Sequence, residues 1–112
     1  MIDTFVIFRV LPDKVGQFES IHRTVLAHMS AMPECLDVEV HRSATEPIEY
    51  MVHGRWESKD AWDRAHQTSA EFRGLFAQLP VEQHSLSRAS FFEPAYGFVR
   101  GVPSSSGLDV SR

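Results

Sequence analysis

Apolar residues recur with two periods along this chain, and each period predicts one kind of element. Residues 4–11 are largely apolar on both faces, which predicts a strand that is covered on both sides. Residues 13–31 carry an apolar stripe at helical spacing. Residues 35–42 and 49–56 alternate between apolar and polar positions, which predicts two half-buried strands that pair as a hairpin.

The segment that follows the strand, from Ser58 to residue 76, is predicted to be helical, with a break near residues 68–69. Ser58 can cap its start, because a serine hydroxyl accepts a hydrogen bond from an unpaired backbone N–H of the first turn. Asp60 follows where the positive end of a helix favours an acid. One face of the segment is apolar, with His66 on or beside it, and it consists of Ala61, Trp62, Ala65, Phe72, Leu75 and Phe76.

The remainder of the chain supplies one more strand and a tail. Residues 81–93 predict the strand, although its period is weak. Residues 97–112 are rich in glycine, serine and proline, and we expect them to form a loose C-terminal tail. These patterns divide the chain into one folded domain over residues 1–96 and the tail over residues 97–112.

The order of the elements predicts an α+β protein with the ferredoxin-like, split βαβ fold. In this fold an antiparallel sheet carries both helices on one face and leaves its second face open. Phe5, Ile7 and Leu11 share one face of the first strand and would need cover there. We therefore expect the protein to be a homodimer.

The composition of the chain argues against some kinds of binding partner and some cellular locations. The 112 residues carry a formal net charge of -4, with acids and bases mixed along the chain, which argues against a nucleic-acid partner. The single cysteine, Cys35, excludes an internal disulfide and favours a reducing, cytoplasmic location. No apolar run approaches the roughly 18 residues of a membrane span, and the acidic first residues are unlike a signal peptide.

The chain carries no motif of a nucleotide- or flavin-binding loop and no visible nucleophile paired with a base. His41, His53 and Glu39 can share one face of the predicted hairpin, and these are ligand types for zinc or non-haem iron. Their spacing matches no known metal signature, so we interpret them as a polar sheet face at a subunit contact. We expect neither a metal nor another cofactor.

His66 is the best single candidate for a catalytic residue. It follows Trp62 by four residues, so the two side chains lie on the same side of the helix. An imidazole beside aromatic walls can titrate near neutral pH and accept a proton. The alternative is a boundary histidine with one hydrogen bond and no function.

The aromatic residues around the predicted strands have two interpretations. Trp56 and Trp62 either line a flat aromatic pocket or fill the core. Tyr50 and Phe8 carry the same ambiguity. His22 either approaches the sheet from the first helix or lies at the edge of its apolar stripe.

One pattern in the chain resembles the antibiotic biosynthesis monooxygenase (ABM) family of small dimeric α/β-barrel proteins. It consists of Trp56, Ser58, Ala61, Trp62, His66, Ser69 and Phe72. The likeness of layout covers about residues 1 to 95. It implies a barrel formed by two sheets across a two-fold axis, and a cofactor-independent monooxygenase that oxidises a quinol-, anthrone- or polyketide-like aromatic substrate with O2. Such an enzyme needs a dry aromatic pocket, a base and groups that hold the enolate.

Under this resemblance His66 is the base and Trp56 is a catalytic pocket wall. Contacts to the substrate then come from Trp62, Tyr50, Phe8, His22 and Phe72. Haem-degrading members of the family carry Asn, Trp and His where this chain has Phe8, Ala65 and Leu75, so the resemblance does not extend to haem.

The alternative function is a non-catalytic dimeric module that binds a small hydrophobic ligand. A buried cavity that reaches both Trp56 and His66 favours the enzyme. A cavity filled by aromatic side chains favours the binding module.

Overall fold

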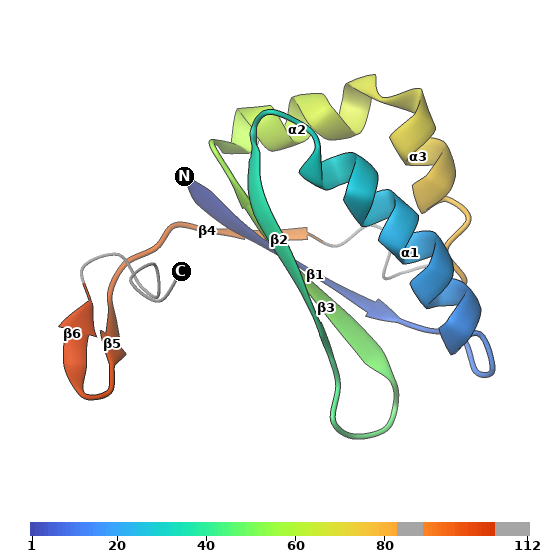
Figure 1. The fold of residues 1–112 in the computed structure, drawn as a ribbon, viewed down its shortest axis with the longest axis horizontal. Coiled ribbons are helices and arrows are strands. Elements are labelled where there is room, and N and C mark those ends of the chain that lie inside the picture. Colours follow the sequence, from blue (N-terminus) through green and yellow to red (C-terminus); the bar gives the residue numbers. More distant parts are fainter. Residues whose placement is uncertain (83–88, 105–112) are drawn as a thin grey trace.

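The computed structural model describes residues 1–82 and 89–104. Its main sheet is antiparallel, has the strand order β2-β3-β1-β4, and consists of β1 (Ile2–Arg9), β2 (Cys35–Arg42), β3 (Glu49–Trp56) and β4 (Ala89–Phe92). One face of the sheet is covered by α1 (Val15–Ser30), α2 (Lys59–Thr68) and α3 (Ala70–Phe76) (Figure 1). This is the α+β, ferredoxin-like arrangement that the element order predicts.

The two hairpin strands begin and end at the predicted residues, whereas the first strand begins earlier. β1 starts at Ile2 and ends at Arg9, two residues before the predicted positions. Asp3 is accommodated inside this strand because its carboxylate lies 2.8 Å from His53 and 3.5 Å from Arg55 on the neighbouring strand β3. The chain leaves the sheet after Val10 and turns at Asp13, whose φ is positive at 63°.

The helical segment after β3 is capped by Ser58 and breaks at Ser69, as predicted, and Ser69 in addition caps the helix that follows. Ser58 accepts a hydrogen bond from the backbone nitrogen of Ala61 at 3.1 Å and starts α2. Ser69 has an extended backbone, and its hydroxyl accepts from the backbone nitrogen of Phe72 at 3.1 Å to start α3. The break therefore places a new helix N-terminus in the middle of the segment.

The core lies between the helices and the sheet. Its largest fully buried side chains are Trp56, Phe8, Phe18 and Val25. At Gly54 on β3 a Cβ would lie 2.8 Å from the Thr4 hydroxyl and 3.0 Å from the indole nitrogen of Trp56. The glycine is therefore what allows these two side chains to approach the strand.

The opposite face of the sheet carries exposed apolar side chains. Ile7 on β1 is 49% exposed and Phe92 on β4 is 56% exposed. Phe5 lies beside them, stacked on His53 with ring centroids 4.5 Å apart. Strict alternation over residues 35–42 predicts Leu36, Val38 and Val40 on one apolar face. For Leu36 this is wrong, because the register shifts between Cys35 and Asp37 and Leu36 in this irregularity is exposed.

The structure describes two parts of the last predicted strand, one at each end. Val81 forms an isolated bridge with Val10, and β4 pairs with β1. Residues 83–88, which fall within the predicted strand, lie outside the described part of the chain.

The chain after β4 differs from the expected loose tail. β5 (Gly97–Val99) and β6 (Val102–Ser104) form a second, two-stranded sheet that lies apart from the main one (Figure 1). Its turn residues Arg100 and Gly101 both have positive φ, which is the geometry of a tight two-residue hairpin. Residues 105–112 of the predicted tail lie outside the described residues.

Candidate active site

His66 on α2 is surrounded by aromatic rings from three elements. Its ring stacks on Trp62 with centroids 3.9 Å apart and meets Phe72 of α3 edge-on at 4.9 Å. Trp56, at the end of β3, lies 5.7 Å away. Residues six apart point to different sides of a continuous helix, so the break at Ser69 is what brings Phe72 against His66.

The tautomer of His66 follows from its hydrogen bond. Nδ1 lies 2.8 Å from the backbone oxygen of Trp62, which can only accept, so Nδ1 carries the hydrogen and Nε2 carries the lone pair. Burial lowers the pKa of His66 below 6.5, against smaller opposing effects of the Trp62 carbonyl and Asp63. His66 is therefore a neutral imidazole at neutral pH, with Nε2 able to take a proton.

His22 on α1 is a second buried imidazole. It is 4% exposed, and its ring contacts Phe18 at 4.8 Å and Phe8 at 5.7 Å. Burial lowers the pKa of His22 from 6.5 to about 4, so this ring is also neutral at pH 7. Within the part of the chain that the structure describes, the imidazole of His22 makes no hydrogen bond.

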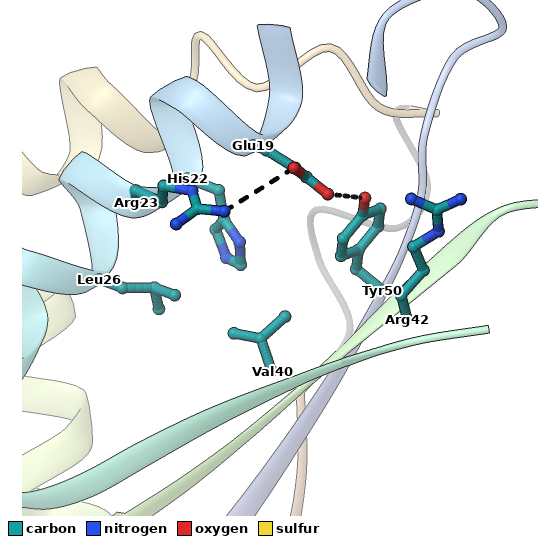
Figure 2. Close-up of a pocket in the computed structure, with 7 residues that line it drawn as sticks. All are labelled: Glu19, His22, Arg23, Leu26, Val40, Arg42 and Tyr50. Atoms are coloured by element: carbon teal, nitrogen blue, oxygen red, sulfur yellow. Dashed lines mark hydrogen bonds and ion pairs between the residues drawn. The ribbon is translucent and has the colours of Figure 1, made fainter. Parts of the chain in front are cut away.

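A cavity of about 360 Å³ opens between α1 and the hairpin of β2 and β3 (Figure 2). We call it the outer pocket, and it is lined by Glu19, His22, Arg23, Leu26, Val40, Arg42 and Tyr50. The Tyr50 hydroxyl donates a hydrogen bond to the Glu19 carboxylate. Burial, and then this carboxylate, raise the pKa of Tyr50, which keeps the phenol protonated. The volume lies in the range of about 300–1,000 Å³ that small-molecule sites occupy.

A much smaller cavity of about 40 Å³ lies between the helices and the sheet. We call it the inner cavity, and it is lined by Thr4, Val6, Phe8, His22, Val25, Leu26, Met29, Val52, Trp62, His66, Phe72 and Phe76. His22 and Leu26 line both spaces, so these two side chains form the wall that the inner cavity shares with the outer pocket.

The structure divides the predicted site residues between the two spaces. Most of them surround the inner cavity: His66, Trp62, Phe72, Phe8 and His22. Tyr50 lines the outer pocket together with His22.

Trp56 is fully buried and lines neither of these two spaces. Its indole nitrogen finds no hydrogen-bond partner in the described part of the chain.

The outer pocket contains two residues, Glu19 and Arg42, that the sequence did not indicate as site residues. The partner of Glu19 is 31 residues away in the chain, and no local pattern signals it.

The histidines on the open sheet face contact carboxylates. Nε2 of His41 lies 3.2 Å from Glu39, and Nε2 of His53 lies 2.8 Å from Asp3. Among the described residues, no group of three or more His, Cys, Asp or Glu side chains is arranged to hold a metal ion. None of the described helices has the length and apolar character needed to cross a membrane.

One protein family matches the sequence of this chain, and several solved structures share its fold. The family model for antibiotic biosynthesis monooxygenase matches residues 1–78. A conserved protein of Methanosarcina mazei is 18% identical, with a TM-score of 0.67 over 81% of this chain and 89% of that one. Rv0793 of Mycobacterium tuberculosis is 20% identical, with a TM-score of 0.66 over 83% of this chain and 93% of that one.

A third structure, from Caulobacter crescentus, is provisionally named an antibiotic biosynthesis monooxygenase. It is 23% identical, with a TM-score of 0.67 over 81% of this chain and 86% of that one. At such identities the likeness to solved structures shows the fold alone. No curated protein matches the chain.

Proposed function

Because this chain belongs to the antibiotic biosynthesis monooxygenase family, we propose that it is a cofactor-independent monooxygenase that oxidises a quinol-, anthrone- or polyketide-like aromatic molecule with O2. The observation that carries the proposal is the state of His66. Its Nδ1 is held by the Trp62 carbonyl at 2.8 Å, and its Nε2 lone pair belongs to a neutral, buried imidazole. A base of this kind accelerates proton removal by about 10²–10⁴-fold.

The reaction balances without a cofactor when the substrate supplies the electrons. For an anthrone-type methylene, Nε2 of His66 removes one C–H proton, and the carbanion passes one electron to O2. The resulting radical pair forms a C–O bond, and the proton on His66 returns to the outer peroxide oxygen. Loss of water, with the remaining C–H hydrogen, leaves a carbonyl group. In sum, the methylene group and one molecule of O2 become a carbonyl group and one molecule of water.

The outer pocket supports a role in holding the organic substrate. Its volume of about 360 Å³ suits an aromatic molecule, and the protonated Tyr50 and the guanidinium of Arg42 line it. These groups would contact oxygen atoms of a phenol or enolate. The reacting edge of the ring would enter between His22 and Leu26, the side chains that both spaces share.

Two observations favour the alternative function. The first is that neither space reaches Trp56, whereas the enzyme is expected to have a cavity that reaches both Trp56 and His66. The second is the size of the inner cavity. The inner cavity of about 40 Å³ is too small for a ring, since an engineered apolar cavity that binds benzene measures about 150 Å³. A substrate must therefore displace side chains to reach His66. If they do not move, the protein is a non-catalytic module that binds a small hydrophobic ligand in the outer pocket.

We also propose that the protein acts as a homodimer. The support is the open face of the sheet, where Ile7 and Phe92 are about half exposed. A sheet with helices on one face buries the other against a second layer. Pairing of two such faces would complete the barrel that the family resemblance implies.

Oxygen uptake tests the proposed function. Purified protein is mixed with a panel of anthrones and quinols in an oxygen-electrode cell, and binding is measured by Trp fluorescence in parallel. We expect one O2 consumed per molecule of product, well above the rate without protein. A compound that binds tightly and causes no uptake, with every other member of the panel also inert, would support the binding module instead.

A further inference from the structure

We propose that the inner cavity is a binding site for molecular oxygen, separate from the outer pocket that receives the organic molecule. The inference rests on the proposed function, which requires O2, and adds the place where O2 is held. It follows from the size of the inner cavity, the chemistry of its walls and its position beside His66.

Size limits the occupant to a few atoms. A cavity needs about 10–15 Å³ by this measure to hold one water molecule. The inner cavity, at about 40 Å³, accepts a diatomic molecule and excludes an aromatic ring. The outer pocket, at about 360 Å³, accepts the ring. The two reactants of an oxygenase differ in size in the same way.

The walls favour an apolar occupant over water. Val25, Met29 and Val52 contribute aliphatic surface from α1 and β3. Three polar side chains line the inner cavity, and two of them are partly committed: the Thr4 hydroxyl donates to the Gly54 oxygen at 3.4 Å and Nδ1 of His66 donates to Trp62, which leaves the His22 ring and Nε2 of His66. The other nine lining residues are aliphatic or aromatic, and cavities with mostly apolar walls take up apolar molecules.

The inner cavity lies where the proposed reaction would need O2. His66 lines the inner cavity, so O2 held there lies beside the base that generates the carbanion. His22 and Leu26 also face the outer pocket, so a substrate edge that enters between them to reach His66 meets O2 without passing through bulk water. Exclusion of water also protects the peroxide and the carbanion from side reactions.

Oxygen-dependent relaxation of methyl resonances tests the site directly and requires no substrate. Dissolved O2 is paramagnetic, and the NMR relaxation of methyl groups near a bound molecule increases with O2 pressure. We expect the methyls of Val25, Met29 and Val52 to relax several-fold faster under O2 than that of Val10, an equally buried residue outside the cavity. Equal effects at Val10 and at the three cavity residues would overturn the proposal.

Two volume-filling variants test the kinetic role. Val25→Ile and Val52→Ile each add one methylene group to the inner cavity, and either one suffices if the other does not fold. We expect a several-fold rise in the KM for O2 with the KM for the organic substrate unchanged. Val40→Ile, whose side chain lines only the outer pocket of the two, should raise the KM for the organic substrate and leave the KM for O2 unchanged.

The two experiments separate this inference from the proposed function. Enhanced relaxation at the cavity methyls, with no compound oxidised, keeps the oxygen site and refutes the oxygenase. Oxygen uptake with no enhanced relaxation keeps the oxygenase and refutes the site. A folded Val25→Ile protein that loses the relaxation effect and keeps the wild-type KM for O2 would refute the role of this site in turnover.

Discussion

The imidazole of His66 lies face to face with the indole of Trp62, at a centroid distance of 3.9 Å, and donates its Nδ1 hydrogen to the backbone oxygen of the same residue. One residue thus fixes both the orientation of the ring and the position of its proton. This relationship needs only the four-residue spacing of a helix, so it is local in sequence. It directs the basic nitrogen away from the helix axis of α2.

Replacement of His66 by Ala should reduce turnover by about 10²–10⁴-fold at neutral pH with the fold intact, because one positioned base is lost. Raising the pH should partly restore the rate, since solvent then ionises the substrate. The measurement is oxygen uptake at two pH values, with circular dichroism as the test of folding.

The matched controls are His41→Ala and His53→Ala, which change histidines on the opposite face of the sheet. We expect both to retain most of the activity. A His66→Ala protein that works as fast as wild type would show that another group, with His22 or Tyr50 next in line, removes the proton.

His22 should make stability depend on pH. Its folded pKa of about 4 lies below the ordinary 6.5, so the unfolded chain takes up a proton first as the pH falls. Stability is therefore complete above pH 6.5 and is lost between 6.5 and about 4. The loss from this group between pH 7 and pH 5 amounts to about 2 kcal/mol.

Urea unfolding of wild type and His22→Phe at these two pH values measures the effect. The variant should lose less stability on acidification, because Phe takes up no proton in the unfolded chain. The same pH dependence in both proteins would assign the acid sensitivity to other groups, His66 among them.

Gly54 and Gly16 should respond to alanine with opposite signs. A Cβ at Gly54 would lie 2.8 Å from the Thr4 hydroxyl and 3.0 Å from the indole nitrogen of Trp56, so Gly54→Ala should destabilise by about 1–3 kcal/mol. A Cβ at Gly16 on α1 meets nothing within 4 Å, and Gly16→Ala should stabilise by about 0.4–1 kcal/mol. Thermal unfolding of both variants decides this, and two shifts of the same sign would contradict it.

Local pattern predicted most of the fold, because most of it is locally determined. The alternation in β2 and β3 gives their bounds, and the hydroxyls of Ser58 and Ser69 cap the helices that follow. The irregularity at Leu36 was missed, since one extra residue in a strand leaves the period on either side unchanged. The hairpin after Gly97 was missed because its turn, Arg100-Gly101, lacks the usual Asn-Gly signal.

The site was less predictable than the fold. The pair of His66 and Trp62 follows from helical spacing, and the structure shows their contact. The outer pocket depends on how α1 lies over the hairpin, which brings Glu19 to Tyr50 across 31 residues of chain. No periodic pattern encodes the space left between two packed elements, so the volumes of the two cavities required the structure.

Ile7→Lys should weaken self-association of the protein. Ile7 lies on the open sheet face and is 49% exposed, so a charge there would be buried in a paired barrel. We expect wild type to sediment as a dimer at micromolar concentration and the variant to shift toward the 12.7 kDa monomer. Ala27→Lys, on the exposed side of α1, is the control that should remain dimeric. Wild type that sediments only as a monomer would exclude the dimer.

The single extended residue between α2 and α3 has a consequence for access to His66. Ser69 also hydrogen-bonds to His28 of α1 at 3.1 Å, and just beyond the short helix Val81 forms a bridge with Val10, so α3 is anchored at both ends. His66 lies before this joint and Phe72 after it, and both side chains line the inner cavity with their rings in contact. Movement of α3 between these two anchors would separate the two rings and widen the inner cavity beside His66.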